Sequence, residues 1–185
     1  SRGLGDVYKR QVQQFTCAGL SFILLVQGCS KESTNLPPER ELTGGRAAYA
    51  HTREIVSLGP RPPGSAALNK TREYIASELE KSGWETFLQP FTKSVAPIGK
   101  RVKFTNLIAR HSGSTHSQIK VLLGAHIDSK YYPDRGFLGA DDAASAVGVI
   151  LEMARRIGND PDQASRVELV FFDGEEAFGQ NISPS

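Results

Sequence analysis

The stretch Val167–Glu176 (VELVFFDGEE) decides the fold class, because it joins a largely apolar strand to a cluster of acidic residues. Its first part, Val167–Phe172, has the length and composition of a strand that is buried within a sheet. A second apolar run, Ile119–Ala125 (IKVLLGA), predicts another buried strand, which we expect at the centre of the same sheet. Both runs are followed directly by polar residues, which is where open α/β sheets bind their ligands.

The remaining pattern completes an α/β fold with a mixed β-sheet flanked by helices. The spacing of apolar residues predicts helices over residues 46–58, 65–82 and 143–157, with Ser65 as the N-cap of the second. Two further strands are predicted over residues 84–92 and 101–110, and Pro90 places the first of them at an edge. The residues expected to face the core from the second and third helices are Leu68, Ile75, Leu79, Val147, Ile150, Leu151 and Ala154.

The composition is that of an ordinary globular domain. Of the 185 residues, 39% are hydrophobic and 23% are charged, which excludes a disordered, collagen-like, coiled-coil or multi-span membrane protein. The formal net charge of +2 comes from residues 1–28, which hold three basic side chains and one acidic one. Because no basic stripe with interleaved aromatic residues is found, no nucleic-acid partner is predicted.

The first forty residues are predicted to be a leader and a linker. Phe15–Val26 is an uncharged stretch of 12 residues, which is too short to cross a bilayer easily and suits a secretory signal. The sequence before Cys29 resembles the lipobox of bacterial lipoproteins. This resemblance implies a signal peptide over residues 12–28, lipidation of Cys29, a linker over residues 29–40 and a membrane-anchored or periplasmic location in the bacterial cell envelope. A plain cleaved signal or a single anchor helix is the alternative.

Two further features of this leader bear on the rest of the chain. Residues 1–11 end in Asp-Val-Tyr-Lys-Arg-Gln, which resembles the translated end of an adaptor used in sequencing libraries. Both cysteines, Cys17 and Cys29, precede residue 30, so neither a disulfide nor a cysteine metal site is expected in the predicted domain.

Three polar clusters mark the predicted carboxyl-end edge of the sheet. They are His126–Lys130 after the first apolar run, Gly139–Asp142 before the last helix, and Asp173–Glu176 after the second run. Several carboxylates in one crevice repel one another unless a divalent cation neutralises them. A set of nitrogen and oxygen ligands without thiolate suits zinc, and suits manganese or cobalt less specifically.

Each cluster also has a plainer interpretation. A histidine after a strand is commonly just hydrogen-bonded, and the pair Asp141-Asp142 at a helix start is suited to capping the helix. The sequence Asp-Gly-Glu-Glu is commonly a solvated turn. The prediction of a metal site therefore depends on the joint occurrence of the three clusters in one small domain.

The same clusters carry a resemblance to a known family. His126–Lys130, Gly139–Asp142 and Phe171–Phe178 (FFDGEEAF) resemble the bacterial glutaminyl cyclases, or glutaminyl-peptide cyclotransferases, of the zinc aminopeptidase-like family. The upstream sequences Gly59–Ser65 (GPRPPGS) and Asn106–Ala109 (NLIA) match as well, so the resemblance runs from about Arg46 to the end of the chain. It implies a zinc exopeptidase-like (phosphorylase/hydrolase-like) fold.

The resemblance also implies a role for each site residue. Asp142 and Glu176 would be ligands of one zinc ion, together with a histidine, and Glu175 would be the general base and acid. His126 and Asp128 would form a supporting hydrogen-bonded pair, or would belong to a second metal as in the related two-metal aminopeptidases. Asp141 would cap the helix or support a ligand, and it is not named as a ligand itself.

The implied reaction closes the N-terminal glutamine of a peptide or protein to pyroglutamate. The α-amine attacks the side-chain amide carbon, zinc polarises the carbonyl, and Glu175 passes the amine proton to the departing ammonia. Because the nucleophile is intramolecular, the enzyme mainly supplies conformation and polarisation.

One departure from the family pattern concerns the third ligand, a histidine expected well beyond Glu176. Only nine residues follow Glu176 and none is histidine, while His51, His111 and His116 lie at positions that do not match. Residues 41–185 are therefore expected to be the N-terminal part of a catalytic domain without its later strands. Such a chain is expected to hold zinc weakly through two carboxylates and to have no useful activity.

Two other functions remain open from the sequence. The first is a zinc aminopeptidase of the same fold, which would use a metal-activated water and would release a free amino acid instead of ammonia. The second is a catalytically inactive binding module of the envelope, whose binding to a peptide or partner would be unaffected by a chelator.

Overall fold

The computed structural model describes residues 39–95, 98–132, 134–176 and 178. The chain divides into two units, residues 1–36 and 37–185, and all described residues lie in the second. The predicted adaptor sequence, the signal peptide and Cys29 lie outside the described residues. Among the residues that are described, no helix has the length and apolar character needed to cross a membrane.

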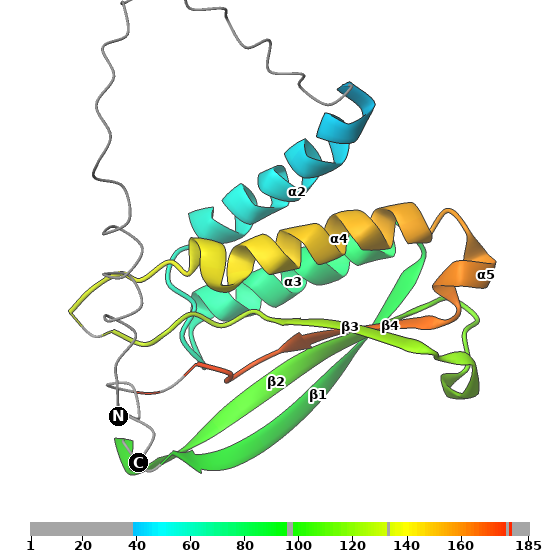
Figure 1. Ribbon diagram of the computed structural model, residues 1–185. Coiled ribbons are helices and arrows are strands. Elements are labelled where there is room, and N and C mark those ends of the chain that lie inside the picture. The colour runs from blue at the N-terminus through cyan, green and yellow to red at the C-terminus, as the bar shows by residue number, and fades with distance from the viewer. Residues whose placement is uncertain (1–38, 96–97, 133, 177, 179–185) are drawn as a thin grey trace, which may run out of the picture. The chain divides into compact units, whose positions relative to one another are not determined.

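A four-stranded mixed sheet forms one layer of the fold (Figure 1). Its strands stand in the order β1-β2-β4-β3; in chain order they are β1 Trp84–Val95, β2 Lys100–His111, β3 Val121–His126 and β4 Val167–Phe172. The pairs β1–β2 and β2–β4 are antiparallel, whereas β3 and β4 are parallel, with His126 opposite Phe172 at their carboxyl ends. The predicted mixed sheet is confirmed, and so, among the strands that the structure describes, is the edge position of β1.

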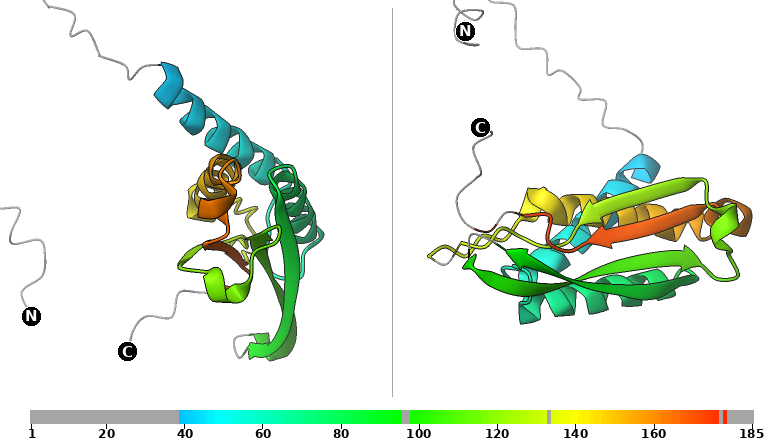
Figure 2. Two further views of the ribbon diagram at one scale, coloured as in Figure 1. Left: turned by 90° about the vertical axis from the view of Figure 1, so that its right-hand side faces the viewer. Right: turned by 90° about the horizontal axis from the view of Figure 1, so that it is seen from below.

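Three long helices lie together on one side of this sheet, as the view from below in Figure 2 shows. They are α2 Glu39–Ser57, α3 Ala66–Glu80 and α4 Ala146–Ile157. Shorter elements join the strands: the 3-10 turn His116–Gln118, the π-helical turn Ala140–Ser145 and the helix α5 Pro161–Ala164. This arrangement confirms the α/β fold class with helices packed against the sheet.

Local sequence explains where helix α3 begins and ends. The Ser65 hydroxyl accepts a hydrogen bond from the backbone N–H of Leu68 at 3.1 Å, which satisfies one of the free donors at the start of α3. After α3 the chain turns at Gly83, whose φ of +80° is favourable only for glycine. Ser65 and Gly83 therefore act as the predicted start and stop signals.

The core lies between the helices and the sheet, and the predicted core positions of both helices are confirmed. All are buried, and the buried cluster comprises Ile55, Leu68, Ile75, Leu79, Trp84, Leu107, Ala109, Ile127, Ala144, Val147, Ile150, Leu151, Ala154, Ala164, Val167, Leu169 and Phe171. The indole of Trp84 also donates a hydrogen bond to the backbone oxygen of Ala154 at 3.1 Å, which satisfies the polar atom of this buried ring.

Two sequence predictions differ from the structure, and one element was missed. The first helix begins at Glu39 instead of Arg46 and runs through Gly44 and Gly45. The missing side chain of Gly44 leaves room for the Arg156 guanidinium, which would lie 2.3 Å from a β-carbon there. Helix α5 was not predicted. The apolar run around β3 does not form the centre of the sheet: β3 is an edge strand among the described residues, and Val121 and Leu122 are exposed.

The buried carboxylate of Glu152 on α4 supports a pH-dependent part of the stability. It accepts hydrogen bonds from Arg155 at 2.8 Å and Arg156 at 2.6 Å, which hold its pKa at about 2 against the opposing effect of burial. A lowered pKa means that this stabilisation is present above the usual glutamate pKa and is lost as the pH falls toward 2.

We therefore expect Glu152→Gln to lower the free energy of unfolding at pH 7 by about 1–2 kcal/mol, since both arginine partners are half exposed. Urea unfolding at pH 7 and at about pH 2.5 measures the difference, which should shrink at the lower pH. The matched control is Glu78→Gln, whose pair with Lys81 lies at the surface and should contribute little at either pH. A Glu152 effect of equal size at both pH values would contradict this prediction.

Candidate metal centre

Three connections converge at the carboxyl ends of the parallel strands β3 and β4 (Figure 1). His126 is the last residue of β3, and Asp173–Glu176 directly follow β4. The third connection leads into α4 through the Ala140–Ser145 turn, where Asp142 and Ala143 leave the helical conformation and are joined by a cis peptide bond. The three polar clusters predicted to meet at one edge of the sheet therefore do so.

Three side chains form a group that can hold a metal ion: His126, Asp142 and Glu176. One ligand atom from each lies within 4.8 Å of the other two. The Nε2 atom of His126 is 2.8 Å from Asp142 Oδ1, and the Asp142 side chain is 70% exposed, so the group opens to solvent. One imidazole nitrogen and two carboxylates with an open side are a donor set that suits catalytic zinc.

Glu175 lies beside this group without belonging to it. Its Oε2 atom is 3.8 Å from His126 Nε2, and 62% of its side chain is exposed. A carboxylate with this position and freedom can reach a molecule bound at the metal group, which is the geometry that a general base requires.

The buried carboxylate of Asp128 fixes the two glutamates from behind. Its Oδ1 accepts a hydrogen bond from the backbone N–H of Glu175 at 3.3 Å, and its Oδ2 accepts one from that of Glu176 at 3.1 Å. The Nδ1 atom of His126 is 3.2 Å from the backbone oxygen of Asp128 and 3.4 Å from its Oδ1. Asp128 is fully buried and therefore supports the site residues instead of facing the solvent side.

The charges of the site favour a bound cation. The Asp128 carboxylate is the main cause that raises the pKa of His126 to about 9, while burial acts in the opposite direction. Burial, and then the charge of Asp142, raises the pKa of Glu176 above its usual value. Like charges held this close are unfavourable alone, and a divalent cation between them removes that cost.

The Asp-Gly-Glu-Glu connection is anchored to the sheet through Asp173. Its Oδ2 accepts hydrogen bonds from the backbone N–H of Thr105 at 2.7 Å and from Arg72 at 3.1 Å. Its own backbone N–H donates to the side-chain oxygen of Asn106 at 2.9 Å. Sequence reasoning gave Asp173 no role, and its contact with Asn106 supplies a physical role for the Asn106–Ala109 motif.

Asp141 does not join the metal group. Its backbone oxygen accepts a hydrogen bond from the Ser145 hydroxyl at 2.7 Å, and that hydroxyl is also 3.4 Å from Asp141 Oδ1. It was predicted to cap the helix or to support a ligand, and these contacts place it within the turn that starts α4.

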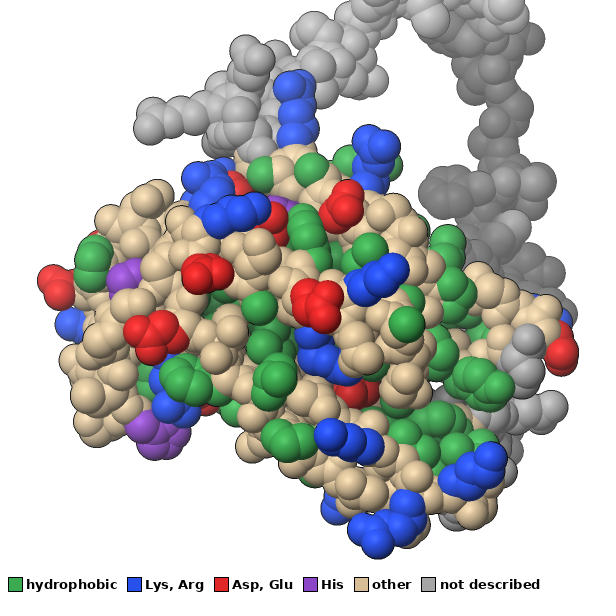
Figure 3. Space-filling model, turned by 180° about the vertical axis from the view of Figure 1, so that it is seen from behind, with side chains coloured by type: hydrophobic (Ala, Val, Ile, Leu, Met, Phe, Trp, Pro, Cys, Tyr) green, Lys and Arg blue, Asp and Glu red, His purple; other side chains and the backbone are tan. Residues whose placement is uncertain are grey.

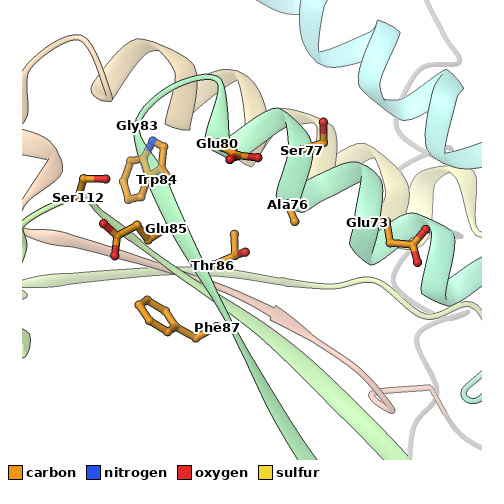
Figure 4. Close-up of a pocket in the computed structure, with 10 residues that line it drawn as sticks. All are labelled: Glu73, Ala76, Ser77, Glu80, Gly83, Trp84, Glu85, Thr86, Phe87 and Ser112. Atoms are coloured by element: carbon orange, nitrogen blue, oxygen red, sulfur yellow. The ribbon is translucent and has the colours of Figure 1, made fainter.

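A separate groove of about 750 Å³ lies at the opposite end of the sheet, between α3 and β1 (Figure 4). Trp84 and Ser112 line it, as do the acidic residues Glu73, Glu80 and Glu85. The register of β1, β2 and β4 separates it from the metal group, because Trp84 pairs with His111 near the start of β4. On the face in Figure 3, acidic and basic side chains are interspersed with hydrophobic ones.

Comparisons with known proteins agree with this geometry. The profile of peptidase family M28 matches residues 106–180. The glutaminyl-peptide cyclotransferase of Drosophila melanogaster is 35% identical over 134 residues, which are 69% of this chain and 37% of that protein. The chain thus spans little more than a third of the length of this relative.

Solved structures give the same result at the level of the fold. The glutaminyl cyclase of Porphyromonas gingivalis has a TM-score of 0.63 and 32% identity, covering 72% of this chain and 46% of that one. A Zn-dependent exopeptidase from Parabacteroides distasonis has a TM-score of 0.63 and 30% identity, covering 76% of this chain and 50% of that one.

The fold and the position of the acidic clusters therefore resemble those of zinc exopeptidases, and residues 106–180 match the profile of peptidase family M28. The chain is also similar in sequence and in fold to glutaminyl-peptide cyclotransferases, as the sequence motifs predicted.

Proposed function

We propose that this chain carries part of the catalytic centre of a glutaminyl-peptide cyclotransferase, which converts N-terminal glutamine of peptides or proteins to pyroglutamate and releases ammonia. The single observation that carries the proposal is the group formed by His126, Asp142 and Glu176 with Glu175 beside it. The relationship to glutaminyl-peptide cyclotransferases supports this choice among the activities of the fold family.

Zinc is the proposed cofactor, with one ion held by Asp142 and Glu176. His126 presents its Nε2 to the same space, either as a further ligand or as a supporting group bonded to Asp128. When bound, zinc would supply a Lewis acid that polarises the side-chain carbonyl of the substrate glutamine.

Glu175 is the proposed general base and acid. The α-amine of the substrate forms a bond to the side-chain amide carbon, and Glu175 accepts the proton that the amine loses. Glu175 then returns this proton to the amide nitrogen as its bond to carbon breaks, so that ammonia leaves and the carboxylate is restored. The backbone N–H of Glu175 donates a hydrogen bond to buried Asp128, while the exposed side chain can move between the amine that loses the proton and the amide nitrogen that receives it.

The test measures ammonia and products from a peptide with N-terminal glutamine, using the protein at the full length that its gene encodes. Ammonia release with a pyroglutamyl peptide and no cleavage is expected. Release of a free amino acid would instead support the zinc exopeptidase activity named for the Parabacteroides distasonis relative. Chelator-insensitive peptide binding with neither product would support an inactive binding module.

The 185-residue chain by itself is proposed to bind zinc weakly and to lack useful activity. It spans only 46% of the length of the Porphyromonas gingivalis glutaminyl cyclase, and the third ligand of the family pattern has no match in its sequence. A zinc titration of this chain and of the Porphyromonas gingivalis glutaminyl cyclase, under the same conditions, tests this prediction. Equal zinc affinity would contradict it.

Attachment to the cell envelope through a lipid on Cys29 is also proposed, on the basis of the leader sequence alone. In a bacterial host that processes lipoproteins, we expect the protein to take up labelled fatty acid and to fractionate with membranes. Cys29→Ala should abolish both properties, whereas Cys17→Ala should leave the label at the mature N-terminus unchanged. Equal labelling of the Cys29→Ala protein would exclude this anchor.

A further inference from the structure

Arg61 is a fully buried arginine in the connection between α2 and α3. Burying a guanidinium is costly unless its donors are satisfied, and buried arginines commonly meet a carboxylate. Here every hydrogen bond of the side chain that the structure gives goes to a backbone carbonyl oxygen instead. The arrangement of these carbonyls indicates what the residue does.

The guanidinium joins the two connections that bring His126 and Asp142 together. Its Nε donates to the Ile127 oxygen at 3.1 Å, directly after β3. Its Nη1 donates to the Leu138 oxygen at 2.8 Å and its Nη2 to the Gly139 oxygen at 3.1 Å, just before the turn that carries Asp142. A further hydrogen bond from Nη1 to the Gly59 oxygen, at 3.3 Å, stays within the connection between α2 and α3 that carries Arg61.

Backbone contacts of the same residue strengthen this junction. The Arg61 N–H donates to the Ser129 hydroxyl oxygen at 2.8 Å, and the Ser129 N–H donates to the Arg61 oxygen at 3.1 Å. The Ser129 hydroxyl donates in turn to the Phe137 oxygen at 3.1 Å. The fit is close, since a β-carbon at Gly139 would lie 3.3 Å from Arg61 Nη2 and 2.4 Å from the Asp142 oxygen.

The charge of Arg61 acts on the same site. Its attraction to Asp128 opposes the effect of burial, which lowers the pKa of the guanidinium. Asp128 is the buried carboxylate that holds the backbones of Glu175 and Glu176. Arg61 thus compensates the charge of the residue that orients the glutamates, and it also binds the two segments next to His126 and Asp142.

We propose that Arg61 is a positioning residue of the metal centre, which fixes the distance between His126 and Asp142 through the backbone carbonyls of their two connections. This inference rests on the proposed zinc site, and it adds a residue that does not touch the metal or the substrate. A residue with this role changes the affinity for zinc in the folded protein, whereas a residue that only stabilises the fold changes the folded fraction.

The test compares Arg61→Met and Arg61→Lys with the wild-type protein at the full length that its gene encodes. Zinc affinity is measured by competition with a chromophoric chelator, at a temperature where circular dichroism shows the protein to be folded. Arg61→Met is expected to weaken zinc binding by about 10–100-fold, as the loss of a residue that orients metal ligands does. Arg61→Lys keeps the charge near Asp128 but not the planar set of donors, so it should restore the affinity only in part.

A readout that needs no metal accompanies this comparison. In the zinc-free protein, Arg61→Met should increase amide hydrogen exchange in residues 126–129 and 139–145. The matched control is Arg110→Met, which removes an arginine paired with Glu168 at the other end of β4. It should change neither the zinc affinity nor the exchange of those two segments.

The outcomes separate this inference from the proposed function. If Glu176→Gln binds zinc as tightly as the wild type, the proposed centre is wrong and the role of Arg61 falls with it. If Glu176→Gln loses zinc while folded Arg61→Met and Arg61→Lys keep the wild-type affinity, only the role of Arg61 is overturned. Should neither Arg61 variant fold, Ser129→Ala removes one contact of the same junction, and an unchanged zinc affinity there would overturn the proposal.

Discussion

In the protein at the full length that its gene encodes, Glu175→Gln is expected to lower the turnover of an N-terminal glutaminyl peptide by about 10²–10⁴-fold, which is the usual contribution of a general acid–base. The amide keeps the shape of the side chain but cannot accept the proton of the attacking amine. Zinc binding should be unchanged, because the metal group consists of His126, Asp142 and Glu176, and the Glu175 side chain lies outside it. The measurement pairs ammonia release with a chelator competition on the same preparation.

The control for this substitution is Glu80→Gln, which makes the same chemical change in the groove at the opposite end of the sheet. It should leave both turnover and zinc affinity as they are. A Glu175→Gln protein that keeps wild-type turnover would remove Glu175 from the proposed mechanism. One that loses zinc together with turnover would make Glu175 part of the metal site.

Asp142→Asn and Glu176→Gln are each expected to weaken zinc binding by at least about 100-fold. Loss of a residue that only orients a metal ligand already lowers the metal affinity by about 10–100-fold. An amide oxygen carries no charge to balance a divalent cation, and both residues present their carboxylates to the same point. The matched control is Asp141→Asn, one residue from Asp142, whose contacts are with Ser145. Its zinc affinity should remain that of the wild type.

A second expectation concerns the stability of the zinc-free Asp142→Asn protein. The charge of Asp142 raises the pKa of Glu176, after the larger effect of burial, so the two carboxylates repel one another without a cation. Asp142→Asn removes this repulsion and also the contact of Asp142 Oδ1 with His126 Nε2 at 2.8 Å, so the stability of the zinc-free protein toward urea should change little. A clear loss of stability in the zinc-free Asp142→Asn protein would show that Asp142 supports the fold instead of serving the metal.

Local patterns in the sequence were sufficient for most of the elements of the fold. The N-cap Ser65 and the apolar spacing of α3 and α4 fix helices and their buried faces by interactions within a few residues. The position of β3 depends on which strands pair with it, and an apolar run such as Ile119–Ala125 does not carry that information. Its composition suited a central strand, whereas the structure pairs it with β4 alone among the described strands.

The candidate site could be predicted from the sequence only where its residues have acidic or metal-binding side chains. The clusters that hold Asp142, Glu175 and Glu176 are predicted because acidic residues follow a strand and open a helix, whereas the resemblance to glutaminyl cyclases implies the role of each residue. The sequence left the roles of His126 and Asp128 open, and the structure brings His126 to the metal group and Asp128 behind the glutamates. Arg61 was not predicted, because hydrogen bonds to distant backbone carbonyls leave no periodic or compositional trace.

The parallel pairing of β3 with β4 has a consequence for folding. His126 stands opposite Phe172, and the acidic connection begins one residue later. Sliding one strand by two residues would keep the same faces inward but would carry the imidazole about 6.6 Å along the sheet. Such a misaligned protein would no longer bring the three candidate ligand atoms together, so the proposed zinc binding would favour the correctly aligned sheet over its slipped alternatives.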